Sequence, residues 1–305
     1  MAADQLLFGL AVRASRAIPF AASLPQPRAA DVLIHCGSFP DLTLTDSTAI
    51  HDVDEPSLRF TFGRTASGTF VFDYPDAARF AVSANEIAFD WREPLTFEDA
   101  CTYLLGPVFA FVLRLRGASC VHASAVAIGG KAVLLAGATA AGKSTLAAAL
   151  VQRGCVLVAE DVVPIAGAHA IPTYPAIRLW PRSVELLFGD RDALPRISPS
   201  WDKRIFVVDA FARAPVPIDA IYFPEAGFGE TRSSLFDVTP HDSAITLIGH
   251  TYRGEILDGA MRRRDFDVLG KLAAELPSRA IVVGRGREEL LRAADLFIED
   301  VQRHV

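Results

Sequence analysis

The chain has 305 residues, of which 51% are hydrophobic and 22% charged, and its formal net charge is −6. This composition supplies enough apolar side chains for one large or two ordinary domains, and it excludes global disorder. The acidic balance argues against a protein whose main partner is the phosphate backbone of nucleic acid. The strongly apolar stretches are shorter than the ~20 residues of a membrane-spanning helix, so we expect no transmembrane segment.

The sequence also favours a cytoplasmic location. Asp4 stands where a signal peptide has positive charge. The four cysteines, Cys36, Cys101, Cys120 and Cys155, contain no CxxC pair. We therefore expect buried thiols rather than a zinc site or a disulfide framework.

Residues 1–95 contain short alternating apolar runs separated by Pro, Gly, Asp and Ser, a pattern typical of strands joined by turns. We expect an antiparallel sheet of about five or six strands here, forming an N-terminal β-rich domain. The remaining residues, 96–305, would form a second domain. It begins with a helix over Phe97–Leu115, because acidic residues open this run and arginines close it. This helix is expected to pack between the two halves.

Further along, the pattern predicts two hairpins and a set of strands and helices. The first hairpin joins Ala123–Ile128 to Lys131–Ala136 through Gly129-Gly130, since both glycines accept positive φ. A second one turns around Gly167. The other predicted elements are a short helix ending at Gly154, strands at Cys155–Ala159 and Asp219–Phe223, and helices near Ser243–Leu257, Arg264–Leu276 and Arg287–Gln302.

The strongest motif starts at Gly137 and reads GATAAGKS, which satisfies GxxxxGK[ST]. A predicted strand precedes it and a predicted helix follows, which is the context that a phosphate-binding loop requires. Its backbone N–H groups would surround the phosphates of ATP, Lys143 would bridge the β- and γ-phosphates, and Ser144 would hold Mg²⁺. The alternative is a glycine-rich helix start that binds nothing.

Two acidic residues follow the motif closely. Glu160 and Asp161 end a predicted strand 17 positions after Lys143, so a strand–loop–helix–strand unit would place both carboxylates beside the loop. One could hold Mg²⁺ while the other accepts a hydroxyl proton. Upstream, His122 could shuttle a proton. The alternatives are two solvated acids in a turn and a structural histidine.

The continuous run VHASAVAIGGKAVLLAGATAAGKSTLAAALVQRGCVLVAEDVV resembles the catalytic core of the HPr kinase/phosphorylase family. The resemblance implies an α/β (α+β) fold with a phosphate-loop core related to phosphoenolpyruvate carboxykinases. It implies that Glu160 is the proton acceptor, that Asp161 lies near the metal with Ser144, and that His122 is the active-site histidine. Ala140 replaces a usual glycine, and Glu160 a usual aspartate. The implied nucleotide-binding residues are Gly137, Ala138, Thr139, Ala140, Ala141, Gly142, Lys143, Ser144 and Thr145.

Segments outside this core, among them YPAIRLWP, WDKRIF and HTYRGEILD, resemble HPr-kinase-related proteins of about this length. Some of these are encoded with lasso-peptide enzymes and phosphorylate a serine of the precursor peptide. The EIRG-like and RPGRN-like segments of true HPr kinases are absent from the sequence. The resemblance thus implies an ATP- and Mg²⁺-dependent kinase for a peptide or protein serine, with HPr disfavoured as substrate and self-association left open.

Three basic residues, Arg178, Lys203 and Arg204, are candidates for a second phosphate clamp, because negative charge spreads over the transferred group. A solvated basic turn is the alternative for the Lys203-Arg204 pair. Two other functions stay open. One is a nucleotide-binding regulatory protein or pseudokinase, which Ala140 and the altered acid pair favour; the other is a small-molecule kinase.

Overall fold

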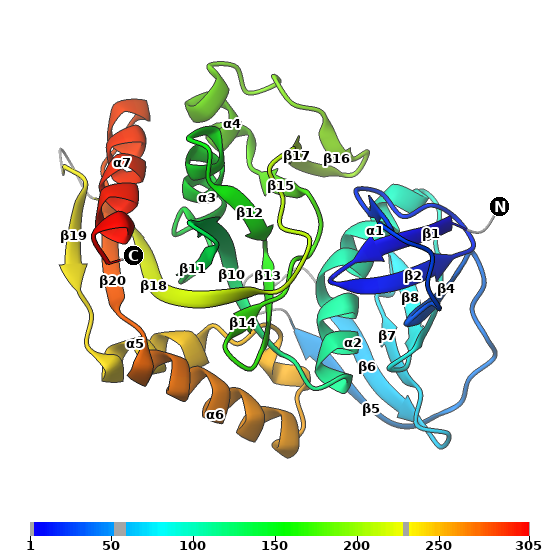
Figure 1. Ribbon diagram of the computed structural model, residues 1–305. Coiled ribbons are helices and arrows are strands. Elements are labelled where there is room, and N and C mark those ends of the chain that lie inside the picture. Colours follow the sequence, from blue (N-terminus) through cyan, green and yellow to red (C-terminus); the bar gives the residue numbers. More distant parts are fainter. Residues whose placement is uncertain (1–2, 52–58, 228–231, 305) are drawn as a thin grey trace.

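The computed structural model describes residues 3–51, 59–227 and 232–304. Its N-terminal part is a sheet of nine described strands in the order β3-β1-β2-β4-β9-β8-β7-β6-β5 (Figure 1). The strands are β1 (Ala3–Leu7), β2 (Leu10–Ala14), β3 (Ala22–Ser23), β4 (Val32–Cys36), β5 (Leu44–His51), β6 (Arg59–Thr65), β7 (Phe70–Asp73), β8 (Ala78–Val82) and β9 (Glu86–Trp91).

The expectation of five or six antiparallel strands is wrong in two respects. The sheet has more strands than expected, in part because β1 and β2 form a hairpin at the very start: Phe8 and Gly9 adopt φ values of 51° and 72° and reverse the chain between them. In addition, β4 runs parallel to both of its neighbours, β2 and β9. Parallel strands are joined by long connections, so the local alternation of apolar residues does not indicate which strands pair in parallel.

The helix predicted over Phe97–Leu115 is confirmed, but it is interrupted. It consists of α1 (Phe97–Tyr103), a π-helical segment η1 (Leu104–Val108) and α2 (Phe109–Leu115). Thr96 and Asp99 form a capping box at its start. Gly106 has non-helical φ and ψ of −120° and −106°, and Pro107 follows within the helix. The helix lies between the N-terminal sheet and the rest of the molecule, and its apolar side chains belong to the same core as those of the sheet (Figure 1).

The larger part of the chain contains an eight-stranded mixed sheet. Strands β10 and β11 form the predicted hairpin, with Gly129 and Gly130 at φ 57° and 80°. The hairpin around Gly167 is confirmed as β13 and β14. Because β11 also pairs with β18 in parallel, strands β10, β13, β14, β18 and β11 close into a ring. The strands are β10 (Ser119–Ile128), β11 (Lys131–Ala136), β12 (Val156–Ala159), β13 (Val162–Ala166), β14 (His169–Ala170), β18 (Val216–Ala226), β19 (Ser234–Asp237) and β20 (Ser278–Val283).

Helices cover both faces of this sheet. One core joins it to α3 and α7, and a second core joins it to α5 and α6 (Figure 1). A small sheet in the order β15-β17-β16 lies beside α3 and α4. These elements are α3 (Lys143–Gln152), α4 (Pro181–Phe188), α5 (Pro240–Gly249), η2 (Gly254–Ile256), α6 (Gly259–Glu275), α7 (Arg287–His304), β15 (Ala176–Leu179), β16 (Arg196–Ser198) and β17 (Trp201–Val207). Among the described residues, no helix is both long and apolar enough to cross a membrane.

Candidate active site

The loop between β11 and α3 curls because three of its residues adopt left-handed backbone conformations. Gly137, Ala140 and Gly142 have φ values of 149°, 64° and 96°. Glycine adopts such angles without strain, whereas the Cβ of Ala140 makes its conformation costly. Gly142 caps α3, so the N-terminal N–H groups of that helix point toward the loop and provide partial positive charge there.

Lys143 lies across the inside of this curl. Its Nζ donates hydrogen bonds to the carbonyl oxygens of Gly137 and Ala138, each at 2.8 Å, and only 6% of the residue is exposed. The loop therefore holds an ammonium group close to the N-terminus of α3, and both attract a polyanion. Thr145, in the first turn of α3, directs its hydroxyl away to Ser183 of α4 at 2.8 Å.

Glu160 follows β12 and is only 2% exposed. Its Oε1 accepts a hydrogen bond from Ser144 Oγ at 2.8 Å, and its Oε2 accepts one from the backbone N–H of Arg178 at 3.2 Å. Burial raises the pKa of Glu160 above its ordinary value, because a buried carboxylate loses its hydration, while the Arg178 guanidinium opposes this effect. The structure thus brings Ser144 of the loop into contact with the first acid of the pair.

Asp161 has a left-handed backbone conformation, with φ 67°. Its Oδ2 accepts a hydrogen bond from Arg178 Nη2 at 2.5 Å. Burial alone would raise the pKa of Asp161, but the Arg178 guanidinium and other nearby cations outweigh it and hold that pKa below its usual range. His122 Nδ1 lies 3.0 Å from the backbone oxygen of Asp161 and 3.8 Å from its Oδ1.

The three basic candidates separate in the structure. Arg178, on β15, reaches both acids, since its Nε also lies 3.6 Å from Glu160 Oε2. Lys203 Nζ lies 5.2 Å from the centroid of the Trp180 ring. Burial raises the pKa of Asp161, whereas Arg178 and Lys203 lower it. Arg204 contacts neither acid: its guanidinium pairs with Asp192 and Asp202. Successive strand residues face opposite sides, so Lys203 and Arg204 cannot both face the acids.

Tyr252 and Gly106 are two further residues of the site that the sequence did not single out. Tyr252 OH donates to Asp161 Oδ2 at 3.4 Å. A Cβ at Gly106 would lie 3.1 Å from the Tyr252 hydroxyl and 4.0 Å from Asp161 Oδ2. The break in the helix therefore brings a residue without a side chain against the acid pair. The only signal in the sequence was Gly106-Pro107 inside an apolar helical run.

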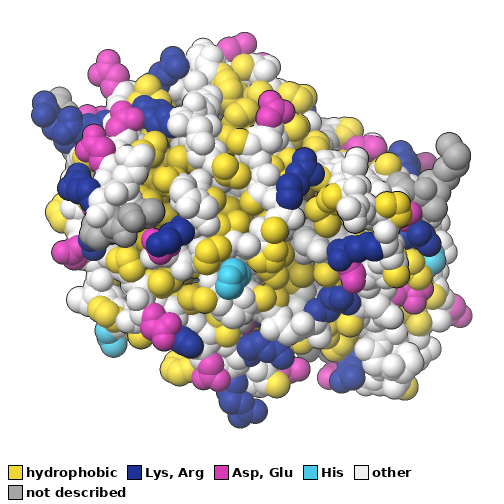
Figure 2. Space-filling view, in the orientation of Figure 1, with side chains coloured by type: hydrophobic (Ala, Val, Ile, Leu, Met, Phe, Trp, Pro, Cys, Tyr) yellow, Lys and Arg dark blue, Asp and Glu magenta, His cyan; other side chains and the backbone are white. Residues whose placement is uncertain are grey.

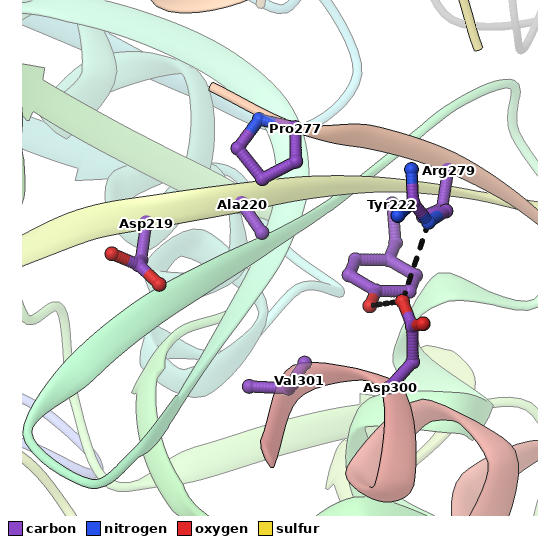
Figure 3. Close-up of a pocket in the computed structure, with 7 residues that line it drawn as sticks. All are labelled: Asp219, Ala220, Tyr222, Pro277, Arg279, Asp300 and Val301. Atoms are coloured by element: carbon purple, nitrogen blue, oxygen red, sulfur yellow. Dashed lines mark hydrogen bonds and ion pairs between the residues drawn. The ribbon is translucent and has the colours of Figure 1, made fainter. Parts of the chain in front are cut away.

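A second cluster lies where β18 and β20 meet α7 (Figure 3). It surrounds a pocket lined by Asp219, Tyr222, Arg279, Asp300 and other residues. Asp219 pairs with Lys131 at the start of β11, whereas the phosphate-loop motif follows the end of that strand. Tyr222 OH donates to Asp300 Oδ2 at 2.5 Å, and Arg279 Nε lies 3.4 Å from the same oxygen. This cluster is a buried polar contact between β18, β20 and α7.

The residues beside the loop fit a magnesium ion. Among the described residues, no group of three or more His, Cys, Asp and Glu side chains is placed to hold a metal ion on its own. Mg²⁺ in phosphoryl-transfer sites is usually held by one or two protein oxygens together with phosphate oxygens and water. Ser144 Oγ and Glu160 Oε1 supply two such oxygens next to the loop.

The fold and these contacts define a mixed α/β protein in which a lysine, a serine and two acids meet at one loop. Residues 114–172, which include the loop and both acids, match the family model of the HPr Serine kinase C-terminal domain. This match supports the family resemblance over that stretch, about a fifth of the chain. No curated protein matches the chain.

One solved structure, that of the Hpr(Ser) kinase/phosphatase from Coxiella burnetii, is similar at 14% sequence identity. The similarity covers 61% of this chain and 99% of that one, with a TM-score of 0.29. A likeness this distant carries no argument about the chain. In the face shown in Figure 2, hydrophobic side chains are scattered across the middle among backbone and uncharged polar atoms, and most charged side chains lie toward the edges.

Proposed function

We propose that the protein is an ATP- and Mg²⁺-dependent kinase that transfers a phosphoryl group to a serine-type hydroxyl. The observation that supports this most is the hydrogen bond of 2.8 Å from Ser144 to Glu160 beside a curled loop, in which Lys143 also donates a hydrogen bond of 2.8 Å to the backbone of Gly137. Asp161 follows Glu160 directly in the chain. The match of residues 114–172 to a kinase family model supports the same reaction class.

In this proposal the backbone from Gly137 to Thr145 surrounds the triphosphate and Lys143 contacts its β- and γ-phosphates. Bound Mg²⁺ neutralises charge that develops on the transferred group. The acid pair provides one carboxylate for the metal and one for the acceptor hydroxyl, and His122 lies close enough to Asp161 to take part in proton transfer. Positioning and electrostatics supply most of the rate, because phosphoryl transfer needs little covalent help from protein.

The acceptor we propose is a serine of a peptide or protein, in the first place a ribosomal precursor peptide of the lasso type. The resemblance of the segments outside the core supports this choice, as does the absence from the sequence of the two segments that true HPr kinases carry. We further propose that residues 1–95 form an N-terminal β-rich domain that takes part in acceptor recognition, and that residues 96–305 form the kinase domain. In this scheme the protein acts in the cytoplasm.

One assay tests the acceptor class. The full chain is incubated with γ-labelled ATP and Mg²⁺ in the presence of a precursor peptide encoded beside its gene, of free serine, or of HPr. Label on a serine of the peptide is the expected result. Label on free serine alone would identify a small-molecule kinase, and label on HPr would contradict the inference drawn from the missing segments. A matched reaction with Lys143→Ala controls for contaminating kinases.

A second function, nucleotide-dependent regulation without phosphoryl transfer, is favoured by one observation. Ala140 holds φ 64° in the loop, where its methyl group strains the backbone that would surround the phosphates. Tight ATP binding without label on any acceptor, and with a normal cellular function of the Glu160→Gln variant, would support regulation over catalysis.

A further inference from the structure

Glu160 and Asp161 are adjacent in sequence, yet different groups hold their carboxylates. Glu160 contacts Ser144 of the phosphate loop, and Asp161 contacts Arg178 and Tyr252. The left-handed φ of 67° at Asp161 turns the chain between the two residues. A non-glycine residue keeps such a conformation only where its surroundings impose it, which is common at functional sites. The two acids therefore have separate positions and can have separate roles.

The position of Glu160 suits a metal ligand. Its Oε1 lies 2.8 Å from Ser144 Oγ. Neighbouring oxygens in an octahedral Mg²⁺ shell are about 2.9 Å apart, because each Mg–O bond is about 2.0–2.1 Å long and adjacent bonds meet at right angles. The two oxygens thus already have the spacing of adjacent magnesium ligands. The hydrogen bond from the backbone of Arg178 to Oε2 fixes the carboxylate in this orientation.

The position of Asp161 suits the acceptor hydroxyl instead. Its side chain is 15% exposed, against 2% for that of Glu160, so an incoming hydroxyl can reach it from solvent. Arg178 and Tyr252 both donate to Oδ2, which leaves Oδ1 directed toward His122. Asp161 is therefore held by two donors at Oδ2, while Oδ1 faces His122 in a side chain that is partly exposed.

We propose that Glu160, with Ser144, is the metal-side acid and that Asp161 is the catalytic residue at the acceptor. This inference rests on the proposed kinase function, and it reverses the assignment that the family resemblance implies. During transfer the acceptor oxygen bonds to the γ-phosphorus, the bond from that phosphorus to the β–γ bridging oxygen breaks with its electron pair remaining on ADP, and the acceptor proton passes to Oδ1 of Asp161.

The test compares Glu160→Gln with Asp161→Asn, two amide replacements that serve as matched controls for each other. Isothermal titration calorimetry measures the affinity of each full-length variant for ATP, once with excess Mg²⁺ and once with EDTA. We expect Glu160→Gln to lower the gain in affinity that Mg²⁺ gives by at least about tenfold, as is usual when a metal site is damaged. Asp161→Asn should keep the wild-type gain while it abolishes phosphoryl transfer.

The outcomes separate this inference from the function on which it rests. Loss of the Mg²⁺ gain in Asp161→Asn, with the gain retained in Glu160→Gln, would overturn the inference and restore the assignment from the resemblance. Absence of ATP binding by the wild-type protein would instead overturn the proposed kinase function. Glu160→Asp provides the conservative check: it keeps the carboxylate and should recover part of the Mg²⁺ gain that Glu160→Gln loses.

Discussion

Replacing Asp265 with alanine should cost the folded protein about 3 kcal/mol. Asp265, on α6, accepts a hydrogen bond from Arg114 Nη1 of α2 at 2.6 Å, and the two side chains are only 4% and 2% exposed. Removing one partner of a buried ion pair leaves the other charge uncompensated, at a typical cost of about 3–5 kcal/mol. We choose the lower end because Arg114 Nη2 would keep its bonds to the carbonyl oxygens of Cys120 and Tyr252.

Urea unfolding, followed by circular dichroism, measures this cost as a shift of the transition midpoint at constant slope. The matched variant replaces both partners, as Arg114→Met with Asp265→Leu. It removes the buried charges together, so it should be more stable than Asp265→Ala even though it changes more atoms. If Asp265→Ala lost less than about 1 kcal/mol, the side chains would be hydrated and the pair would not act as a buried ion pair.

Four further predictions concern the loop, the acid pair and the thiols. Lys143→Ala should weaken ATP binding by about tenfold or more, measured by calorimetry, because charge-assisted hydrogen bonds to phosphate are lost; unchanged affinity would show that the loop does not hold the triphosphate. Tyr252→Phe should lower kcat severalfold at unchanged KM for ATP, whereas Tyr222→Phe, which removes a hydroxyl–carboxylate bond to Asp300 rather than to the acid pair, should leave both constants unchanged. Ala140→Gly should tighten ATP binding, because it relieves about 1 kcal/mol of backbone strain and removes a methyl group from the loop; weaker binding would refute the strain argument. In the native protein at about pH 8, a disulfide reagent should modify Cys36 first, because it is partly exposed whereas the other three cysteines are buried; burial raises the thiol pKa of all four, so access decides the order, and equal rates at all four would contradict it.

The sequence was most informative where chain-local chemistry determines the structure. Short-range spacing and backbone angles that glycine favours determine the Gly129-Gly130 turn and the curl after Gly137. The spacing also places β12, which leads into the acid pair, beside β10. The number of strands in residues 1–95 was underestimated, because Phe8 adopts a positive φ that its residue type does not indicate. The parallel pairing around β4 was missed because it joins residues that are far apart in the chain.

The directions of side chains were the other feature that the sequence could not predict. Lys203 and Arg204 are equally basic neighbours, but only the register of β17 against β15 decides which one lies on the same face as Arg178. Tyr252 reaches Asp161 across 91 positions of sequence, and no local pattern connects them. The separate contacts of Glu160 and Asp161 likewise depend on the backbone turn at Asp161, which the residue types do not indicate.

The interrupted helix over Phe97–Leu115 also limits how this protein can evolve by recombination. Phe8 of the N-terminal hairpin stacks on Phe109 with ring centroids 4.8 Å apart, and its backbone N–H donates to the carbonyl oxygen of Thr173. A chain that began at residue 96 would expose one side of this helix to water and withdraw support from the Gly106 break beside the acids. Because the N-terminal region shares its core with this helix, we expect its exchange for an unrelated domain to disturb the acid pair and the loop from Gly137 to Thr145.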